Sequence, residues 1–159
     1  MIRHFRGKWT KLSNYSYCTV WYGDHLYPTN EHAYQAQKSL DPGIQKMIRN
    51  APTPAKAKAI ARSVKLRPDW EEVKQPIMLA LLREKFSQEP ERSLLLSTGT
   101  DELVEGTDTW HDTEWGVCSG TVCPRAPHEP SGKNLLGKLL MQVRSELAPE
   151  FLDIFPNLR

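Results

Sequence analysis

The chain has no long apolar run and little net charge, and both absences limit what it can be. No segment of its 159 residues approaches the roughly 18 consecutive apolar residues of a membrane span. Met1-Ile2-Arg3-His4 does not open like a signal peptide. A net charge of +2 supplies no general attraction to nucleic acid or to an anionic membrane. We therefore expect a cytoplasmic or nuclear protein without a membrane partner, in which any basic pocket is local.

Cysteine is scarce as well. Three cysteines, an odd number, do not make a disulfide framework in a chain of this length, and a reducing compartment fits them best. Neither repeats nor low-complexity tracts nor linkers interrupt the sequence. With 39% hydrophobic and 25% charged residues, the composition is that of a folded globular protein. We expect one domain over residues 1–159, large enough for a real core.

Hydrophobic spacing predicts an α+β domain in which helices surround a small sheet. Strands are expected at 5–9, 19–22, 25–27 and 102–105, with Gly23-Asp24 as a hairpin turn. Helices are expected from Thr29 or Asn30 to about 41, and at 44–51, 54–64, 69–86, around 94–96 and at 132–147. The segment 117–131 holds three prolines and should be a surface loop, often a binding loop or lid in compact domains.

The segment 30–38 carries the most informative pattern. In a helix, Glu31, Tyr34, Gln35 and Lys38 fall at i, i+3, i+4 and i+7, which places an acid, a phenol, an amide and an amine on one stripe. A soluble helix usually buries an apolar stripe instead. The pattern therefore indicates either the solvated side of a surface helix or the wall of a polar pocket.

Three further patterns are weak when taken singly. Asp69 is expected to cap a helix, which leaves Trp70 in its first turn, where a helix terminus attracts phosphate. Asp112-x-x-Trp115-Gly116 fits simple turn chemistry. Gly132-Lys133-Asn134 at a helix start can bind phosphate through backbone N–H groups and the lysine charge. This last segment lacks the pattern of a nucleotide-hydrolysing P-loop.

The cysteines and histidines allow two other interpretations. Cys118-x4-Cys123-x4-His128, with His111 as a fourth ligand, would suit zinc, but zinc-site cysteines usually have two to four residues between them. We favour unrelated exposed residues, and predict no metal and no cofactor. A cysteine nucleophile can also be posed, but no spacing singles out a pair among Cys18, Cys118, Cys123, His25, His32 and His111.

Taken in order, these patterns resemble one family. The set is Leu12-Ser13-Asn14, Glu31-His32-Ala33-Tyr34-Gln35-Ala36, Lys38, Arg67-x-Asp69-Trp70, Asp112-x-x-Trp115-Gly116 and Gly132-x-Asn134-x-Leu136-Gly137-x-x-Leu140-Met141-x-x-Arg144. From about Phe5 to Arg144 it resembles the NADAR family, named for proposed links with NAD and ADP-ribose metabolism. The chain departs from the family pattern at Tyr15-Ser16-Tyr17-Cys18 and Ala61-Arg62, and in the longer loop 117–131.

The resemblance implies hydrolysis of an N-glycosidic bond between ribose and an amine. Two substrate types are associated with the family: ADP-ribose on the amino group of guanine in DNA or RNA, and phosphoribosylamino intermediates of riboflavin synthesis. The long loop favours the larger, nucleic-acid-borne substrate, which implies a functional pairing with an ADP-ribosyltransferase. A non-catalytic module that binds ADP-ribose is the third hypothesis, and the titratable groups at the matched positions argue against it.

The resemblance also implies roles for individual residues. Lys38 is the candidate for a Schiff base with the sugar, or else a ligand of phosphate or ribose hydroxyls. Glu31 and Asp112 are the candidate acid and base, in an order that the sequence does not assign. The predicted substrate-binding residues are Asn14, Tyr34, Gln35, Arg67, Trp70, Trp115, Gly132, Lys133, Asn134 and Arg144. Arg144 has an alternative role, since an arginine late in a helix can satisfy carbonyls of its own helix terminus.

Overall fold

The computed structural model describes residues 1–149, so residues 150–159 of the predicted domain lie outside the described part. Contacts divide the chain into two compact units. The middle unit is Ser13–Glu89, and the terminal unit combines Met1–Leu12 with the residues from Pro90 on. The predicted helix-rich fold with few strands is confirmed, and the named strands form two separate two-stranded sheets within residues 1–149.

The middle unit opens with the predicted hairpin. Strands β2 (Val20–Tyr22) and β3 (His25–Tyr27) pair antiparallel, with Val20 opposite Tyr27. Gly23 in the turn has a φ of +57°, a conformation that glycine adopts without steric cost. The Gly-Asp step between two aromatic and β-branched runs was therefore a sound hairpin signal.

Four helices follow: α1 (Asn30–Ala36), α2 (Pro42–Arg49), α3 (Pro54–Arg62) and α4 (Trp70–Lys85). Thr29 and Thr53 cap α1 and α3 by accepting a hydrogen bond from the N–H three residues on, and Asp41 caps α2 in a similar way. Pro42 and Pro54 stand at first helical positions, where a missing N–H costs nothing. Because Asp41 supplies the cap, α2 begins two residues before the predicted start.

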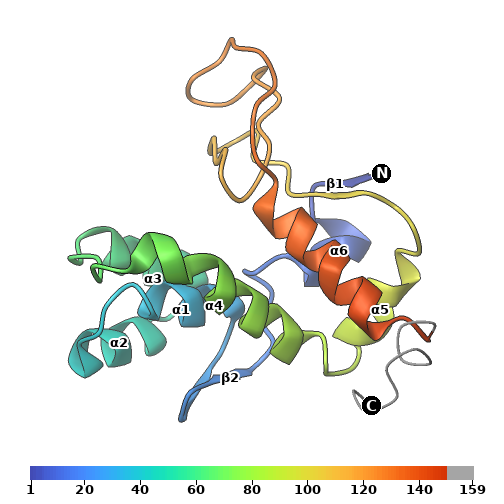
Figure 1. The fold of residues 1–159 in the computed structure, drawn as a ribbon. Coiled ribbons are helices and arrows are strands. Elements are labelled where there is room, and N and C mark those ends of the chain that lie inside the picture. The colour runs from blue at the N-terminus through green and yellow to red at the C-terminus, as the bar shows by residue number, and fades with distance from the viewer. Residues whose placement is uncertain (150–159) are drawn as a thin grey trace. The chain divides into compact units, whose positions relative to one another are not determined.

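Helix α1 occupies the centre of the middle unit (Figure 1), in contact with α2, α3, α4 and both strands of the hairpin. It is shorter than predicted and ends at Ala36. The N–H groups of Gln37, Lys38 and Ser39 bond to carbonyls three residues back, which tightens the chain into a turn. Lys38 therefore lies in this turn, just past the helix rather than on its last turn.

The terminal unit is built on a short parallel pair, β1 (Ile2–Arg3) with β4 (Leu103–Val104). The predicted strand at 5–9 is wrong, because a 3₁₀ helix, η1 (Gly7–Leu12), occupies this region. Gly7 has a φ of +56°, which turns the chain out of the extended conformation, and only Leu12 of η1 is buried. Helix α5 (Glu91–Ser97) packs against η1.

Helix α6 (Leu135–Leu147) packs on β4 and α5. Leu136, Leu140 and Val143 form its buried face as predicted, whereas Leu139 is only half-buried. Gly137 completes the face because a Cβ there would overlap the carbonyl oxygen of Leu103. No helix within residues 1–149 is both long enough and apolar enough to cross a membrane.

Candidate active site

The polar stripe of α1 is buried. Glu31, Tyr34 and Gln35 are only 7%, 6% and 3% exposed, and every residue of the helix is buried. The interpretation as a solvated helix side is therefore wrong for these three residues. Gln35 Nε2 donates to Glu31 Oε1 at 2.8 Å, the i, i+4 pairing that the sequence spacing allowed.

The hydrogen bond to Glu31 fixes the orientation of the Gln35 amide. A carboxylate only accepts, so the amide nitrogen must face Glu31 and the amide oxygen must point elsewhere. That buried oxygen, Gln35 Oε1, has no hydrogen-bond partner among residues 1–149. Buried acceptors are rarely left in this state in a folded protein. Gln35 therefore presents an acceptor suited to a hydroxyl or N–H group of a ligand.

Two aromatic rings and an amine adjoin this stripe. The rings of Tyr34 and Trp70 are tilted by 55° with centroids 5.1 Å apart. Lys38 Nζ lies 5.7 Å from the centroid of Tyr34 and 5.8 Å from that of Trp70, within cation–π range of both. The N–H of Arg67 donates to the Lys38 carbonyl at 2.8 Å, which anchors the turn that carries the amine. The structure thus brings Tyr34, Lys38 and Trp70 together.

Arg67 and Asp69 form a two-pronged ion pair. Arg67 Nε and Nη2 donate to the two carboxylate oxygens of Asp69 at 2.6 and 3.0 Å. This hydrogen bonding lowers the pKa of Asp69. The prediction that Asp69 caps α4 is wrong in one respect: it stands at the N-cap position, but its side chain makes no capping bond. A phosphate at Arg67 would have to share the guanidinium with Asp69.

Asn14 fastens the start of α1. Its carbonyl accepts from the N–H of Glu31 at 3.1 Å, and its Oδ1 accepts from Asn30 Nδ2 at 3.4 Å. Its neighbour Tyr15 was not among the predicted site residues. Partial burial and the charge of Glu31, opposed by Arg62, raise the pKa of Tyr15 to about 12, although this residue is still 41% exposed.

The other six predicted site residues belong to the terminal unit. Asp112 Oδ1 accepts from the N–H groups of Glu114 and Trp115, each at 2.9 Å. This is the turn chemistry that the sequence allowed for Asp112-x-x-Trp115-Gly116. Thr107 Oγ1 adds a bond to the Asp112 carbonyl at 2.6 Å. Asp112 and Trp115 thus share one tightly bonded turn.

The start of α6 differs from the predicted phosphate cradle. The N–H groups of residues 133–136 already donate to the carbonyls of residues 113–116, at 2.8 to 3.3 Å. Gly132 is needed where the two segments meet, because a Cβ would overlap the Gly116 carbonyl. An anion at this place would have to be held by the side chain of Lys133, which is exposed, rather than by the backbone.

Asn134 and Arg144 make bonds that stabilise the terminal unit. Asn134 has a left-handed φ of 53°, and its side-chain amide donates to the Leu103 carbonyl and accepts from the Glu105 N–H. Arg144 Nη1 donates to Thr98 Oγ1 and to the Asp101 carbonyl, both at 2.8 Å. Arg144 therefore satisfies a carbonyl close to α5 and not one at the end of its own helix, so the alternative role predicted for it is wrong.

The interpretation of His111, Cys118, Cys123 and His128 as unrelated exposed residues is wrong. One donor atom from each of the four lies within 4.8 Å of the others. Cys118 is fully buried and Cys123 is 5% exposed. Cys18 belongs to the middle unit and is no part of this cluster.

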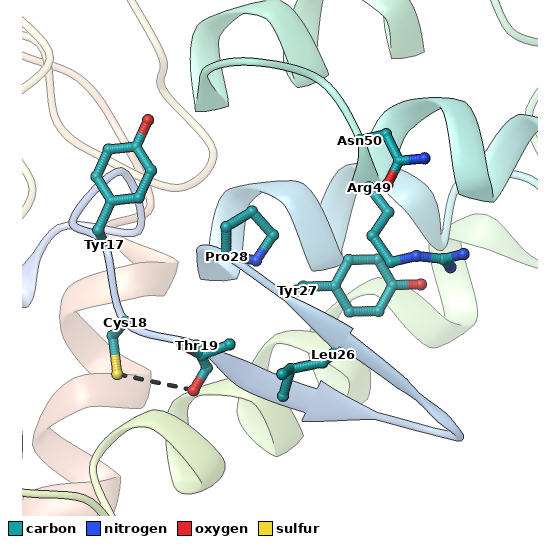
Figure 2. A pocket seen from close by; sticks show the side chains of 8 residues that line it. All are labelled: Tyr17, Cys18, Thr19, Leu26, Tyr27, Pro28, Arg49 and Asn50. Atoms are coloured by element: carbon teal, nitrogen blue, oxygen red, sulfur yellow. Dashed lines mark hydrogen bonds between the residues drawn. The ribbon is translucent and has the colours of Figure 1, made fainter.

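A separate open pocket lies between the hairpin and the end of α2 (Figure 2). It is lined by Tyr17, Cys18, Thr19, Leu26, Tyr27, Pro28, Arg49 and Asn50, none of which was predicted as a site residue. The lining contains no carboxylate to act as acid or base.

Comparison with known proteins agrees with the motif order. The model of the family described as "NADAR domain" matches residues 4–148. The N-glycosidase YbiA of Escherichia coli is 39% identical over 142 residues, covering 87% of this chain and 82% of that protein. The N-glycosidase Npun_R5314 of Nostoc punctiforme is also 39% identical, with coverages of 86% and 84%.

The solved structure of E. coli YbiA, determined by NMR, has a similar fold. It superposes with a TM-score of 0.75 at 37% identity, covering 96% of this chain and 87% of that one. The family match over nearly the whole chain and the two similar N-glycosidases together settle the classification. The chain belongs to the NADAR family and is an N-glycosidase, a hydrolase of N-glycosyl bonds.

Proposed function

We propose that the chain hydrolyses the bond between ribose C1′ and an amine nitrogen, with Glu31 and Lys38 as the reacting groups. The observation that carries this proposal is the buried Glu31–Gln35 pair, whose Gln35 Oε1 has no partner among residues 1–149. A ribose hydroxyl is a suitable donor to that oxygen, and it would orient the sugar against Glu31. The rings of Tyr34 and Trp70 offer apolar surface for stacking of the base.

Lys38 supplies a covalent route. After Glu31 assists opening of the ribose ring to an imine, the neutral Nζ of Lys38 adds to C1′. The base amine then leaves with a proton, and a Lys38–C1′ imine remains. Water adds to this imine, C1′ separates from Nζ, and the sugar closes again as the free ribose. The sum is one water consumed and one amine released. Asp112 is the second candidate acid or base, a role that stays a prediction from the sequence.

For the substrate, we propose ADP-ribose attached to the amino group of guanine in DNA or RNA. The family resemblance supports this choice, as does the long loop 117–131, which adds surface for a large substrate and includes the exposed Val122. An ADP-ribosyltransferase would be the enzyme class that creates such a substrate.

A second substrate class is favoured by two similar proteins. A riboflavin biosynthesis protein of Vibrio vulnificus, VVA0006, is 34% identical over 139 residues, and the chain covers 35% of its length. A riboflavin biosynthesis protein of Zea mays, PYRR, is 36% identical over 139 residues, and the chain covers 20% of its length. Phosphoribosylamino intermediates contain the same ribose–amine bond, so one site would serve for either class.

Offering both substrates to the purified protein decides between them. We expect release of ADP-ribose from modified DNA, with Glu31→Ala inactive and no comparable turnover of the small intermediate. Turnover of the small intermediate alone would assign the riboflavin class instead. If neither substrate is cleaved by the wild-type protein under conditions in which E. coli YbiA is active, the proposed reaction is wrong.

Borohydride trapping tests the covalent step. Reduction during turnover should add the sugar to the protein, and peptide mapping should place the adduct on Lys38. Lys65→Ala removes an exposed lysine of the same unit and should still form the adduct, whereas Lys38→Ala should not. Turnover without any adduct would exclude the Schiff base and leave Lys38 as a binding residue.

A further inference from the structure

We propose that His111, Cys118, Cys123 and His128 form a structural zinc site that closes the loop of the terminal unit. The four side chains come from one segment, residues 111–131, which contains no helix or named strand. They are the group of potential metal ligands that the fold brings together within residues 1–149. The proposal is independent of the substrate and of the role of Lys38.

The spacing of the donor atoms suits a tetrahedral ion. Cys123 Sγ lies 3.1 Å from His128 Nε2 and 3.4 Å from His111 Nδ1, and Cys118 Sγ lies 3.5 Å from His128 Nε2. Zinc–sulfur and zinc–nitrogen bonds of about 2.3 and 2.0–2.1 Å give a sulfur–nitrogen edge of roughly 3.6 Å in a tetrahedron. These three sulfur–nitrogen pairs therefore need to separate by about half an ångström at most, whereas the most distant pair of donor atoms, up to 4.8 Å apart, has to approach by about an ångström.

The donor set selects zinc. Two sulfurs and two imidazole nitrogens in a tetrahedral arrangement are typical of zinc. Magnesium and calcium prefer oxygen ligands, so thiolate and imidazole ligands exclude them. On binding, each thiol gives its proton to water, so the two thiolates neutralise the charge of Zn²⁺. All four positions are then filled by protein, which is the arrangement of a structural rather than a catalytic ion.

The surrounding backbone holds the ligands in place. His128 Nδ1 donates to the carbonyl of Glu129 at 2.6 Å, which leaves Nε2 as the ligating nitrogen. Cys118 and Ser131 exchange both backbone hydrogen bonds at 2.9 Å, and the N–H of His128 bonds to the Gly120 carbonyl. Gly120 has a φ of +80°, and a Cβ there would overlap the His128 carbonyl. The loop is therefore shaped to bring Cys118 and His128 together.

Two other uses of these thiols fit the geometry less well. A nucleophilic cysteine must face a substrate, but Cys118 and Cys123 are buried and point at histidines of their own loop. A disulfide between them would consume both thiols and leave two imidazoles facing it with no bond to make. Of these three uses, metal binding is the one that employs all four donors at once.

The ion would have a consequence for the neighbouring turn. His111 directly precedes Asp112, whose carboxylate holds the N–H groups of Glu114 and Trp115. A zinc–His111 bond would fix the entry to that turn. We therefore assign zinc a positioning role for Asp112 and Trp115, rather than a part in bond cleavage.

Metal analysis of the full chain tests the site. The protein should be purified under reducing conditions without chelator, and its zinc measured by plasma mass spectrometry. We expect about one zinc per chain for the wild type and for Cys18→Ser, the matched control outside the cluster, and loss of it in Cys123→Ser. Exchange for Co²⁺ in the wild type should give the visible absorption of a tetrahedral site with thiolate ligands. This measurement needs no variant, so a misfolded variant cannot affect it.

Each result bears on the proposal. Stoichiometric zinc that survives in Cys18→Ser and disappears in Cys123→Ser supports it, as does the cobalt spectrum in the wild type. Reduced wild-type protein that binds neither zinc nor cobalt overturns it. A disulfide between Cys118 and Cys123 also overturns the proposal if the protein still binds no metal after the disulfide is reduced. Iron or copper bound in preference to zinc would overturn the choice of ion.

Discussion

The buried wall of α1 and the 111–131 loop both concentrate polar side chains, but they hold them in different ways. In α1 the helix supplies the spacing, so Glu31 and Gln35 meet at i, i+4. In the loop, His111 and His128 stand 17 positions apart, and irregular turns bring their rings to 4.9 Å. Regular structure makes polar neighbours readable from the sequence, whereas turns do not.

The two regions also differ in what they leave incomplete. On α1 two buried amide oxygens, Asn30 Oδ1 and Gln35 Oε1, have no hydrogen-bond partner among residues 1–149. The one beside Glu31, Gln35 Oε1, suits a substrate that binds and leaves. In the loop four soft donors converge on one point, which suits an ion that stays. The first arrangement is therefore expected to govern catalysis, and the second to govern stability. The following predictions test that division.

The largest expected effect is on turnover by Glu31→Gln. This change keeps the size of the side chain and a bond to Gln35, but removes the titratable carboxylate. We expect kcat to fall by about 10²–10⁴-fold while the melting temperature changes little. Glu72→Gln, which alters an exposed acid of α4 in the same unit, is the matched control and should keep full activity. Equal losses in the two variants would remove Glu31 from the reaction.

Metal removal should separate the loop from α1. Chelation of the purified protein is expected to lower the melting temperature by roughly 8 °C, the shift for losing a ligand held at about a hundredfold its Kd. The same treatment of Cys123→Ser should change nothing, because its site is already broken. If chelation removes the zinc from the wild-type protein but leaves its melting temperature unchanged, the ion does not stabilise the fold.

Asn134→Gly tests the joint between the loop, β4 and α6. Glycine accepts the left-handed φ of 53° but loses the bonds to Leu103 and Glu105, so we expect a stability loss of about 2 kcal/mol in urea unfolding. Asn134→Asp retains the acceptor for the Glu105 N–H but turns a carboxylate oxygen towards the Leu103 carbonyl, so it should lose at least as much. If both variants are as stable as the wild type, the side-chain bonds contribute little to the fold.

The smallest expected effect is a pH dependence from His32 in α1. Burial, partly opposed by the hydrogen bond with Ala51, lowers the pKa of this fully buried histidine. Below about pH 6.5 the unfolded chain takes up a proton that the folded chain resists, so stability should fall as the pH drops from there towards the folded pKa. The slope is at most about 1.4 kcal/mol per pH unit.

Urea midpoints of the wild type and of His32→Gln at about pH 7.5 and 5.5 measure this dependence. His32→Gln should be less sensitive to acid, whereas His25→Gln, at an exposed position of β3, should behave as the wild type does. Equal slopes in all three proteins would show that His32 does not carry the effect.

Much of the middle unit was predictable because its signals are local. The helix predicted to start at Thr29 or Asn30 is capped by Thr29, the Gly23 turn joins the predicted hairpin, and the spacing of Glu31 and Gln35 gives their contact. The end of α1 was not predictable, because neither Gln37 nor Lys38 is a residue that breaks helices. Only the hydrogen bonds of the turn end the helix there.

The terminal unit was predicted less well because its contacts join distant segments. The N–H groups that open α6 bond to carbonyls of 113–116, and nothing in Gly132-Lys133-Asn134 announces those partners. Residues 5–9 alternate like a strand, yet the positive φ of Gly7 sends the chain into η1. The sequence argued against zinc only because four residues separate Cys118 from Cys123 and from there His128 is equally distant, whereas His111 lies further away. The usual spacing of two to four residues describes two ligands in one short turn, and it does not describe ligands that a long folded loop brings together.

The complete burial of α1 makes this helix a convenient reporter. Its amide hydrogens are shielded by α2, α3, α4 and the hairpin, so they should exchange with deuterium only when the middle unit opens as a whole. Exchange rates over residues 33–37 would therefore measure the integrity of the buried polar stripe of α1 without any substrate. In a variant that loses activity while these amides remain protected, the substitution has removed a group needed for the reaction. In a variant that loses both activity and amide protection, the substitution has disrupted the fold.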